Sequence, residues 1–108
     1  MPLINITAKS RNKYNAKPTT IDGIRFDSKK EARVYQDLVL QWKAGQIRYF
    51  VRQVPIDLPG GVKMRVDFLV MHNDGHEQWL DAKGKATRDW LNKKKIAEAI
   101  YPIKIETI

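Results

Sequence analysis

The sequence predicts a mixed α/β fold in which a mixed sheet is flanked by helices, with the element order helix, three strands, helix, strand. Two stretches carry apolar residues at helical spacing, and three runs rich in β-branched and aromatic residues lie between them. A short segment in which apolar and charged residues alternate follows the second helical stretch. Because hairpins give antiparallel neighbours and a crossover helix gives a parallel one, this order predicts a three-strand meander extended by one crossover.

The composition describes one small, strongly basic domain. The chain has 108 residues with 20 Lys+Arg against 12 Asp+Glu, so its formal net charge is +8. That excess favours an acidic partner, either nucleic acid or an anionic membrane surface. The sequence has no cysteine, which excludes disulfides and thiolate metal sites and fits a cytoplasmic location. Apolar runs are too short for a transmembrane helix or a signal peptide. Neither predicted helix has a broad apolar face backed by a solely basic one, so we expect no membrane partner.

Residues 1–20 are predicted to form a basic N-terminal arm that precedes a single domain over residues 21–108. The arm contains four cations and no acid, with a short strand expected at residues 3–6. The segment from Ile21 to Ile24 then reads as a tight turn between two short extended pieces, because Asp22-Gly23 tolerates the positive φ that such turns need.

The first helix is predicted from Ser28 to Ala44. Ser28 is a candidate N-cap, and Glu31 stands three residues later, as in a capping box. Gly45 ends the helix. Its apolar positions recur at helical spacing, and they are Ala32, Tyr35, Leu38, Val39 and Trp42.

Three strands and a second helix follow. The strands are predicted over residues 47–58, 62–71 and 77–83, with turns at 59–61 and 72–76. In the middle strand Met64, Val66, Phe68 and Val70 share one face. The second helix is predicted from Thr87 or Arg88 to Ile100, and a closing strand lies near residues 103–107. The expected apolar side of that helix comprises Trp90, Leu91, Ile96, Ala97 and Ile100.

Asp81, Ala82 and Lys83 form the first pattern with chemical meaning. Residues two apart in a strand share a face, so Asp81 and Lys83 are expected to project together while Ala82 turns into the packing. A carboxylate beside a lysine can bind a hard divalent cation and position a water next to it. The competing interpretation is a solvated ion pair on the sheet surface.

Asp67 interrupts an otherwise apolar strand, where a charge is costly to desolvate unless it is paired or bound to a metal. The predicted hairpin places Asp67 opposite a residue close to Asp81, and two such acids repel unless a cation lies between them. Alternatively, Asp67 pairs with Arg65 or Lys83. Glu31 is the third acid, because it lies in line with the apolar stripe of the first helix. It is either a capping residue only or a carboxylate that also faces the sheet.

A group of cations follows the Asp-x-Lys strand. Lys93, Lys94 and Lys95 span about half the helix circumference at roughly 100° per residue, so they cannot all face the core. Together with Lys85 and Arg88 they form a basic rim where a phosphate backbone would pass. The alternative is a solvated helix face.

Other residues are assigned no chemistry. Trp42, Trp79 and Trp90 are interpreted as core residues rather than base-stacking platforms. His72 and His76 flank a turn without a third ligand at metal spacing. No phosphate loop, dinucleotide fingerprint or nucleophile elbow is present, so we expect no nucleotide cofactor.

The order of the acidic residues along the chain resembles that of the PD-(D/E)xK nuclease superfamily. The residues are Glu31 on a first helix, Asp67 on a central strand and Asp81-Ala82-Lys83 on the next strand. The lead-in IDGIRFDSKKEA, residues 21–32, resembles the start of small phage-encoded endonucleases in that superfamily, which are relatives of VRR-NUC domains and archaeal Holliday junction resolvases. The resemblance runs from Arg11 to the C-terminus, although Val66 stands where the motif has proline. It implies a restriction-endonuclease-like αβββαβ core.

The resemblance also implies a metal-dependent DNA endonuclease that hydrolyses phosphodiester bonds, with branched DNA such as a Holliday junction or flap as its substrate. Asp67 and Asp81 would bind Mg²⁺ or Mn²⁺, with the Ala82 carbonyl as a further ligand. Lys83 would orient or activate the attacking water and offset charge on the phosphate.

Glu31 would hold a second metal or its water, and Gln53 resembles a polar residue that borders the site in related enzymes. The expected DNA-binding residues are Lys9, Arg11, Lys13, Lys85, Arg88, Lys93 and Lys94. We expect a homodimer, because two-fold substrates suit a two-fold enzyme. The alternatives are a non-catalytic DNA-binding protein that retains the fold and a structural protein of a phage particle.

Overall fold

The elements of the fold follow the predicted mixed α/β order. The computed structural model describes residues 18–83 and 85–108. A short hairpin, β1 (Thr19–Ile21) and β2 (Ile24–Phe26), leads into α1 (Lys29–Lys43). Then come β3 (Ile47–Leu58), a 3₁₀ turn (Pro59–Gly61), β4 (Val62–His72), β5 (Glu77–Asp81), α2 (Arg88–Ile100) and β6 (Ile105–Thr107). The mixed α/β class and the predicted sequence of elements are confirmed.

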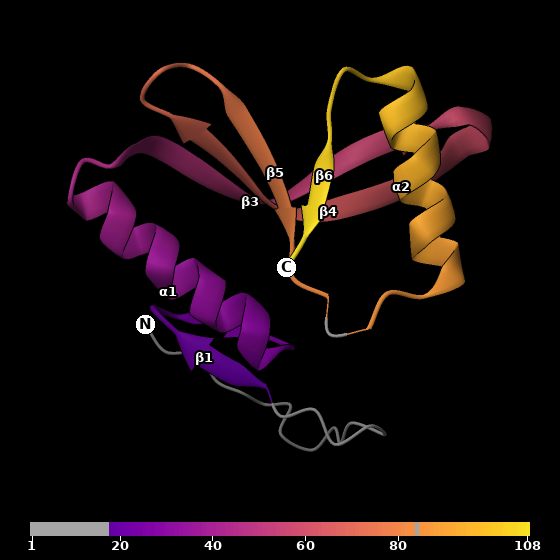
Figure 1. The fold of residues 1–108 in the computed structure, drawn as a ribbon. Helices are drawn as coiled ribbons and strands as arrows, with labels where there is room; N and C mark the ends of the chain where they lie inside the picture. The colour runs from indigo at the N-terminus through magenta and orange to yellow at the C-terminus, as the bar shows by residue number, and fades with distance from the viewer. Residues whose placement is uncertain (1–17, 84) are drawn as a thin grey trace.

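The main sheet has four strands in the order β3-β4-β5-β6 (Figure 1). The first three strands form an antiparallel meander, and β6 pairs in parallel with β5 after the crossover through α2. The sheet is therefore mixed, as predicted. The β1–β2 hairpin forms a separate two-stranded sheet beside α1.

The two helices pack against different apolar clusters of the main sheet. Leu80 belongs to the apolar cluster that contains α1, whereas its neighbour Trp79 packs against the cluster that contains α2. Each helix therefore has its own apolar cluster on the sheet. Figure 1 shows the long β3–β4 hairpin running from beside α1 to behind α2.

The N-terminal hairpin confirms the predicted tight turn. Asp22 and Gly23 adopt φ values of 53° and 77°, which the turn between β1 and β2 requires. Strand β1 begins at Thr19, two residues inside the range predicted for the arm. The expected strand at residues 3–6 lies outside the described residues.

Helix α1 begins and ends where the sequence predicts. The Ser28 hydroxyl accepts a hydrogen bond of 3.0 Å from the backbone N–H of Glu31, and Ala32, Tyr35 and Leu38 are buried against the sheet. Trp42, by contrast, is 52% exposed to solvent. The prediction that Trp42 is a core residue is therefore wrong, because the last turn of α1 extends beyond the apolar cluster.

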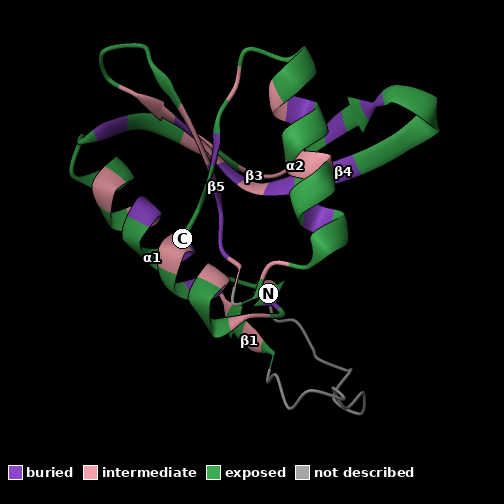
Figure 2. Ribbon diagram, turned by 45° about the vertical axis from the view of Figure 1, so that its right-hand side comes forward, coloured by how far each residue is buried: buried purple, intermediate pink, exposed green. Residues whose placement is uncertain are grey.

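Helix α2 buries a narrower face than its sequence suggests. Trp90 and Ala97, two turns apart, are buried, whereas Leu91, Ile96 and Ile100 are exposed (Figure 2). The prediction that these last three residues belong to the core side is wrong. Only the line through Trp90 and Ala97 meets the sheet, and the residues about 100° to either side of it remain in solvent.

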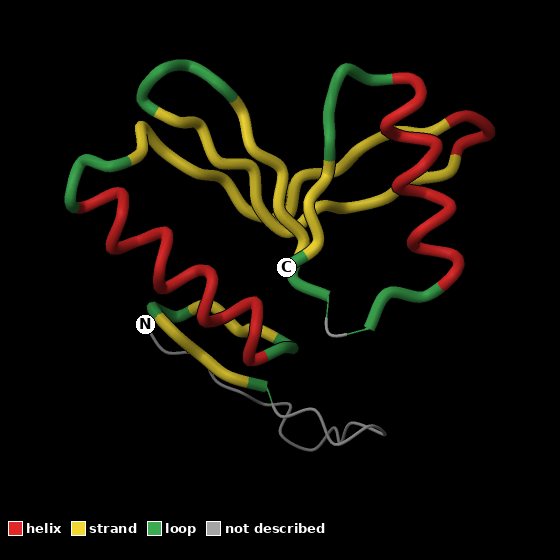
Figure 3. The backbone as a smooth tube through the Cα atoms, viewed as in Figure 1, coloured by secondary structure: helices red, strands yellow, loops and turns green. Residues whose placement is uncertain are grey.

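The central strand β4 alternates as predicted, with Met64, Val66, Phe68 and Val70 all buried. Strand β5 is shorter than predicted, because it ends at Asp81 and the chain then turns away towards α2 (Figure 3). Among the described residues, neither helix has the length and apolarity needed to cross a bilayer.

Candidate active site

Asp67 and Asp81 lie opposite each other where the β4–β5 ladder ends. The last ladder pair is Phe68 with Leu80, so the next positions outward are the two acids. Asp81 Oδ1 accepts a hydrogen bond of 2.9 Å from the backbone N–H of Asp67. In return, Asp67 Oδ2 accepts one of 2.9 Å from the backbone N–H of Ala82. The predicted proximity of the two acids is confirmed, and backbone donors fix both carboxylates.

Burial makes this pair of carboxylates electrostatically costly. Asp81 is 0% exposed, and the partner of its Oδ2 atom is the Lys83 ammonium, 3.1 Å away. Burial raises the pKa of Asp67, and the charge of Asp81 raises it further. The Ala82 N–H and the Lys83 ammonium oppose that rise without cancelling it. A raised pKa means that the surroundings disfavour the ionised form, which a bound cation would favour.

Lys83 reaches Asp81 although it lies beyond the strand. Its Nζ atom is 3.1 Å from Asp81 Oδ2, so the predicted pairing is confirmed, although strand alternation does not produce it. The same ammonium lies 5.0 Å from the ring centroid of Trp90. Trp90 is in the first turn of α2, whose N-cap Thr87 accepts a hydrogen bond from the Trp90 N–H. The start of α2 therefore positions the lysine.

Glu31 faces the sheet from the first turn of α1. Its Oε2 atom accepts a hydrogen bond of 2.8 Å from Gln53 Nε2, and the same nitrogen lies 3.3 Å from Asp67 Oδ1. Burial is the main cause that raises the pKa of Glu31, and Asp67 adds to it. Both interpretations of Glu31 hold in part, because its backbone N–H completes the helix cap while its carboxylate joins the acidic cluster.

Gln53 adopts an unusual backbone conformation at this point. It lies between the ladder pairs Arg52–Phe68 and Val54–Val66, which places it opposite Asp67 on β3. Its φ of 52° falls in the left-handed region, which is strained for a residue other than glycine. Such strain of about 1–3 kcal/mol persists where surrounding contacts over-determine the conformation, and it concentrates at functional sites. Here it lets the amide contact two carboxylates.

Arg52 is a site residue that the sequence analysis missed. Its Nη2 atom lies 3.7 Å from Glu31 Oε2, and its guanidinium carbon lies 4.7 Å from the ring centroid of Phe26. The buried Nε atom has no hydrogen-bond partner. The only available signal was a cation beside Gln53 in a strand of apolar residues. That signal is weak, since exposed strand positions carry arginine routinely.

The donor chemistry of this cluster suits a hard divalent cation. Carboxylate and carbonyl oxygens are the ligands that Mg²⁺ and Mn²⁺ prefer, and Asp81 Oδ2 is a buried oxygen whose partner is the Lys83 ammonium. Within residues 18–83 and 85–108, however, no three carboxylate or imidazole groups converge closely enough to hold one ion together. Asp67 and Asp81 are the two carboxylates that lie together, while the Gln53 amide lies between Glu31 and Asp67.

The predicted basic residues divide into two kinds. Lys85 and Arg88 are exposed at the start of α2. Lys93 lies 3.4 Å from the carboxylate of Asp89, and Lys94 lies 3.4 Å from that of Glu98, so both are paired along the helix. The predicted contacts Lys9, Arg11 and Lys13 lie outside the described residues.

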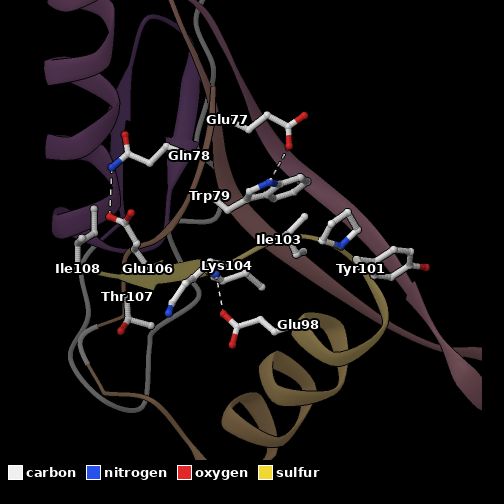
Figure 4. A pocket seen from close by; sticks show the side chains of 12 residues that line it. Glu77, Gln78, Trp79, Glu98, Tyr101, Ile103, Lys104, Glu106, Thr107 and Ile108 are labelled. Atoms are coloured by element: carbon white, nitrogen blue, oxygen red, sulfur yellow. Dashed lines mark hydrogen bonds between the residues drawn. The ribbon is translucent and has the colours of Figure 1, made fainter. Parts of the chain in front are cut away.

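A broad pocket of about 980 Å³ beside β6 contains none of these acids (Figure 4). Its three glutamates each accept a hydrogen bond from a neighbour. Glu77 accepts one from the Trp79 indole, Glu106 from the Gln78 amide and Glu98 from the Ile105 N–H. The last of these caps a backbone donor of the edge strand β6.

These observations describe a mixed α/β domain with a buried acidic cluster at the divergence of two central strands. The chain belongs to the family described as "Protein of unknown function (DUF1064)", whose profile matches residues 11–107. No curated protein and no solved structure matches the chain.

Proposed function

We propose that this protein is a metal-dependent DNA endonuclease of the PD-(D/E)xK type with a restriction-endonuclease-like core. The observation that carries the proposal is the pair Asp67 and Asp81. Two acids lie face to face beside a lysine, in surroundings that raise the pKa of one of them. A solvated surface ion pair would not be buried, and Asp81 has no exposed surface. A buried pair of like charges is costly unless a cation joins it.

Asp67, Asp81 and the Ala82 carbonyl would hold Mg²⁺ or Mn²⁺, and Glu31 would act on a second ion or its water. When bound, the cation would stabilise the negative charge that develops on the scissile phosphate. The Lys83 ammonium, held between Asp81 and the Trp90 ring, would offset charge on the same phosphate and orient the attacking water.

Two further groups would support this chemistry. Gln53 holds the Glu31 and Asp67 carboxylates in position, and Arg52 balances part of their charge. Exposed cations such as Lys85 and Arg88 would hold the DNA backbone without reading sequence. We propose branched DNA as the substrate, a homodimer as the acting form and the cytoplasm as the location.

A cleavage panel tests the proposal. Single-stranded, duplex, flap and four-way-junction DNA are incubated with the protein in Mg²⁺, Mn²⁺ or EDTA. We expect cation-dependent products, and a loss of at least roughly a hundredfold in rate for Asp81→Asn and Lys83→Met. Asp37→Ala, on the exposed side of α1, is the matched control. Circular dichroism checks folding, and equal rates for Asp81→Asn and the parent would exclude the assigned site.

A non-catalytic DNA-binding protein is the second candidate. It is favoured by the hydrogen bonds that already satisfy Asp67 and Glu31, and by the lack of a three-residue metal cluster in the described part of the chain. This function predicts DNA binding that falls steeply with salt and no product from any substrate with either cation. The same panel, read beside a binding assay, separates the two candidates.

A further inference from the structure

An open groove lined by aromatic side chains lies between the second half of α1 and β3. Its volume is about 470 Å³, and its aromatic lining residues are Tyr35, Trp42, Tyr49 and Phe50. Tyr35 is buried and Phe50 is half-buried, with their ring centroids 5.9 Å apart in an edge-to-face arrangement. Trp42 and Tyr49 are 52% and 43% exposed. The groove thus has a fixed aromatic floor and two exposed aromatic walls.

The groove and the acidic cluster share one face of α1 and one face of β3. On α1, Tyr35 follows Glu31 by four residues, so the two side chains lie on the same helix face. On β3, Phe50 precedes Arg52 by two residues, so these also share a face, and Arg52 contacts Glu31. The helix axis from Glu31 to Trp42 covers about 16 Å, the length of about five stacked nucleotides.

The net charge of the chain favours a polyanion over a second copy of the chain as the occupant of the groove. Lys43 lines the groove, and Arg52 lies on the same β3 face as the lining residue Phe50. The groove's one acid, Asp22, accepts a hydrogen bond of 2.9 Å from the Tyr35 hydroxyl. The chain as a whole carries a net charge of +8, so a second copy would bring like charge to the groove.

We propose that this groove binds single-stranded DNA by stacking unpaired bases on Trp42 and Tyr49. Every base has a flat π-face, so exposed aromatic side chains beside cations bind single strands with little sequence preference. A base paired within a duplex stacks on its neighbours and cannot offer that face. The inference builds on the proposed nuclease function, since the groove would deliver an unpaired strand to the acidic cluster.

Binding without divalent cations tests this inference separately from cleavage. The full chain in EDTA is titrated against a fluorescein-labelled thymidine 12-mer and, in parallel, a labelled blunt 12-base-pair duplex. We expect Trp42→Ala and Tyr49→Ala each to weaken binding to the single strand about tenfold, with duplex binding changed less than twofold. Trp42→Phe retains a ring and should recover most of the affinity. Leu91→Ala, an exposed apolar residue on α2, is the control.

A second readout uses the protein's own fluorescence. The thymidine 12-mer should quench tryptophan emission in the wild type and leave it unchanged in Trp42→Phe. If Trp42→Ala and Tyr49→Ala lost affinity equally for the single strand and the duplex, or lost affinity for neither, the proposal would be overturned. Light scattering gives a further test. If Trp42→Ala dissociated a dimer but kept its affinity for the single strand, the proposal would also be overturned, because the groove would then bind a second copy of the chain. A failure to cleave DNA would leave these binding results standing.

Discussion

The carboxylates of Asp67 and Asp81 each accept a hydrogen bond from a backbone N–H group that lies just beyond the last pair of the β4–β5 ladder. Asp81 Oδ1 accepts from the Asp67 N–H, and Asp67 Oδ2 accepts from the Ala82 N–H. The carboxylates are thereby fixed by backbone donors in a position where they repel each other. An asparagine can accept the same bonds through its amide oxygen, so charge and geometry can be varied separately at these positions.

The first prediction concerns the pH dependence of stability. The folded state raises the pKa of Asp67 and Glu31, so it binds protons more tightly than the unfolded state does. Their contribution to the free energy of unfolding should therefore fall as pH rises from roughly 4, the unfolded value, through the raised pKa values. Asp67→Asn should lack its share of this fall and should be more stable than the parent at pH 8.

Urea unfolding of both proteins from pH 4 to pH 8 in EDTA measures this difference. Mg²⁺ should reduce the fall in the wild type, because a bound cation stabilises the ionised carboxylates. Parallel pH curves for the two proteins would contradict the assigned cause.

The second prediction separates the two roles of Glu31. The helix cap uses its backbone N–H, which donates to Ser28, whereas the acidic cluster uses its carboxylate. Ser28→Ala should lower the free energy of unfolding by about 1 kcal/mol and leave the cleavage rate of the folded protein unchanged. Glu31→Gln should abolish cleavage and keep the cap. Urea titration measures stability and the cleavage panel measures activity. Loss of cleavage in folded Ser28→Ala would refute the separation of the two roles of Glu31.

The third prediction uses the position of Gln53 between two carboxylates. Gln53→Glu is nearly isosteric and places a third acid there. Without divalent cations at pH 8, we expect its Tm to fall by about 5 °C, since a loss near 1 kcal/mol shifts a domain of this size by that amount. Saturating Mg²⁺ should raise the Tm of the variant more than that of the wild type. Gln36→Glu, on the exposed face of α1, is the matched control, and equal Tm shifts in both variants would rule out this role.

The fourth prediction distinguishes exposed cations from paired ones. Lys85 and Arg88 are exposed, whereas Lys93 and Lys94 lie within 3.4 Å of carboxylates on the same helix. Lys85→Ala and Arg88→Ala should each reduce the slope of log K against log salt for duplex DNA by about 1. Lys93→Ala and Lys94→Ala should change it less. Anisotropy titrations between low and moderate salt measure the slopes, and four equal changes would count against the assignment.

Much of the architecture was predictable because it depends on short-range patterns. The N-cap at Ser28 and the alternation from Met64 to Val70 determine where helix α1 starts and which face of β4 is buried. The turn between β4 and β5 sets a register in which Asp67 meets Asp81. These features follow from backbone hydrogen bonding at fixed periods, which a sequence records directly.

Other features were decided only by the tertiary structure. The positive φ of Gln53 breaks strand alternation, so Arg52 and Gln53 both reach Glu31 although their neighbouring positions predict opposite faces. Trp42 carries a core residue's pattern yet lies beyond the edge of the apolar cluster. The sequence by itself therefore determined the elements and the acids that converge. The other side chains that lie beside those acids depend on the twist of the strands and on where each helix extends past the sheet. Neither property follows from the periodicity of the sequence.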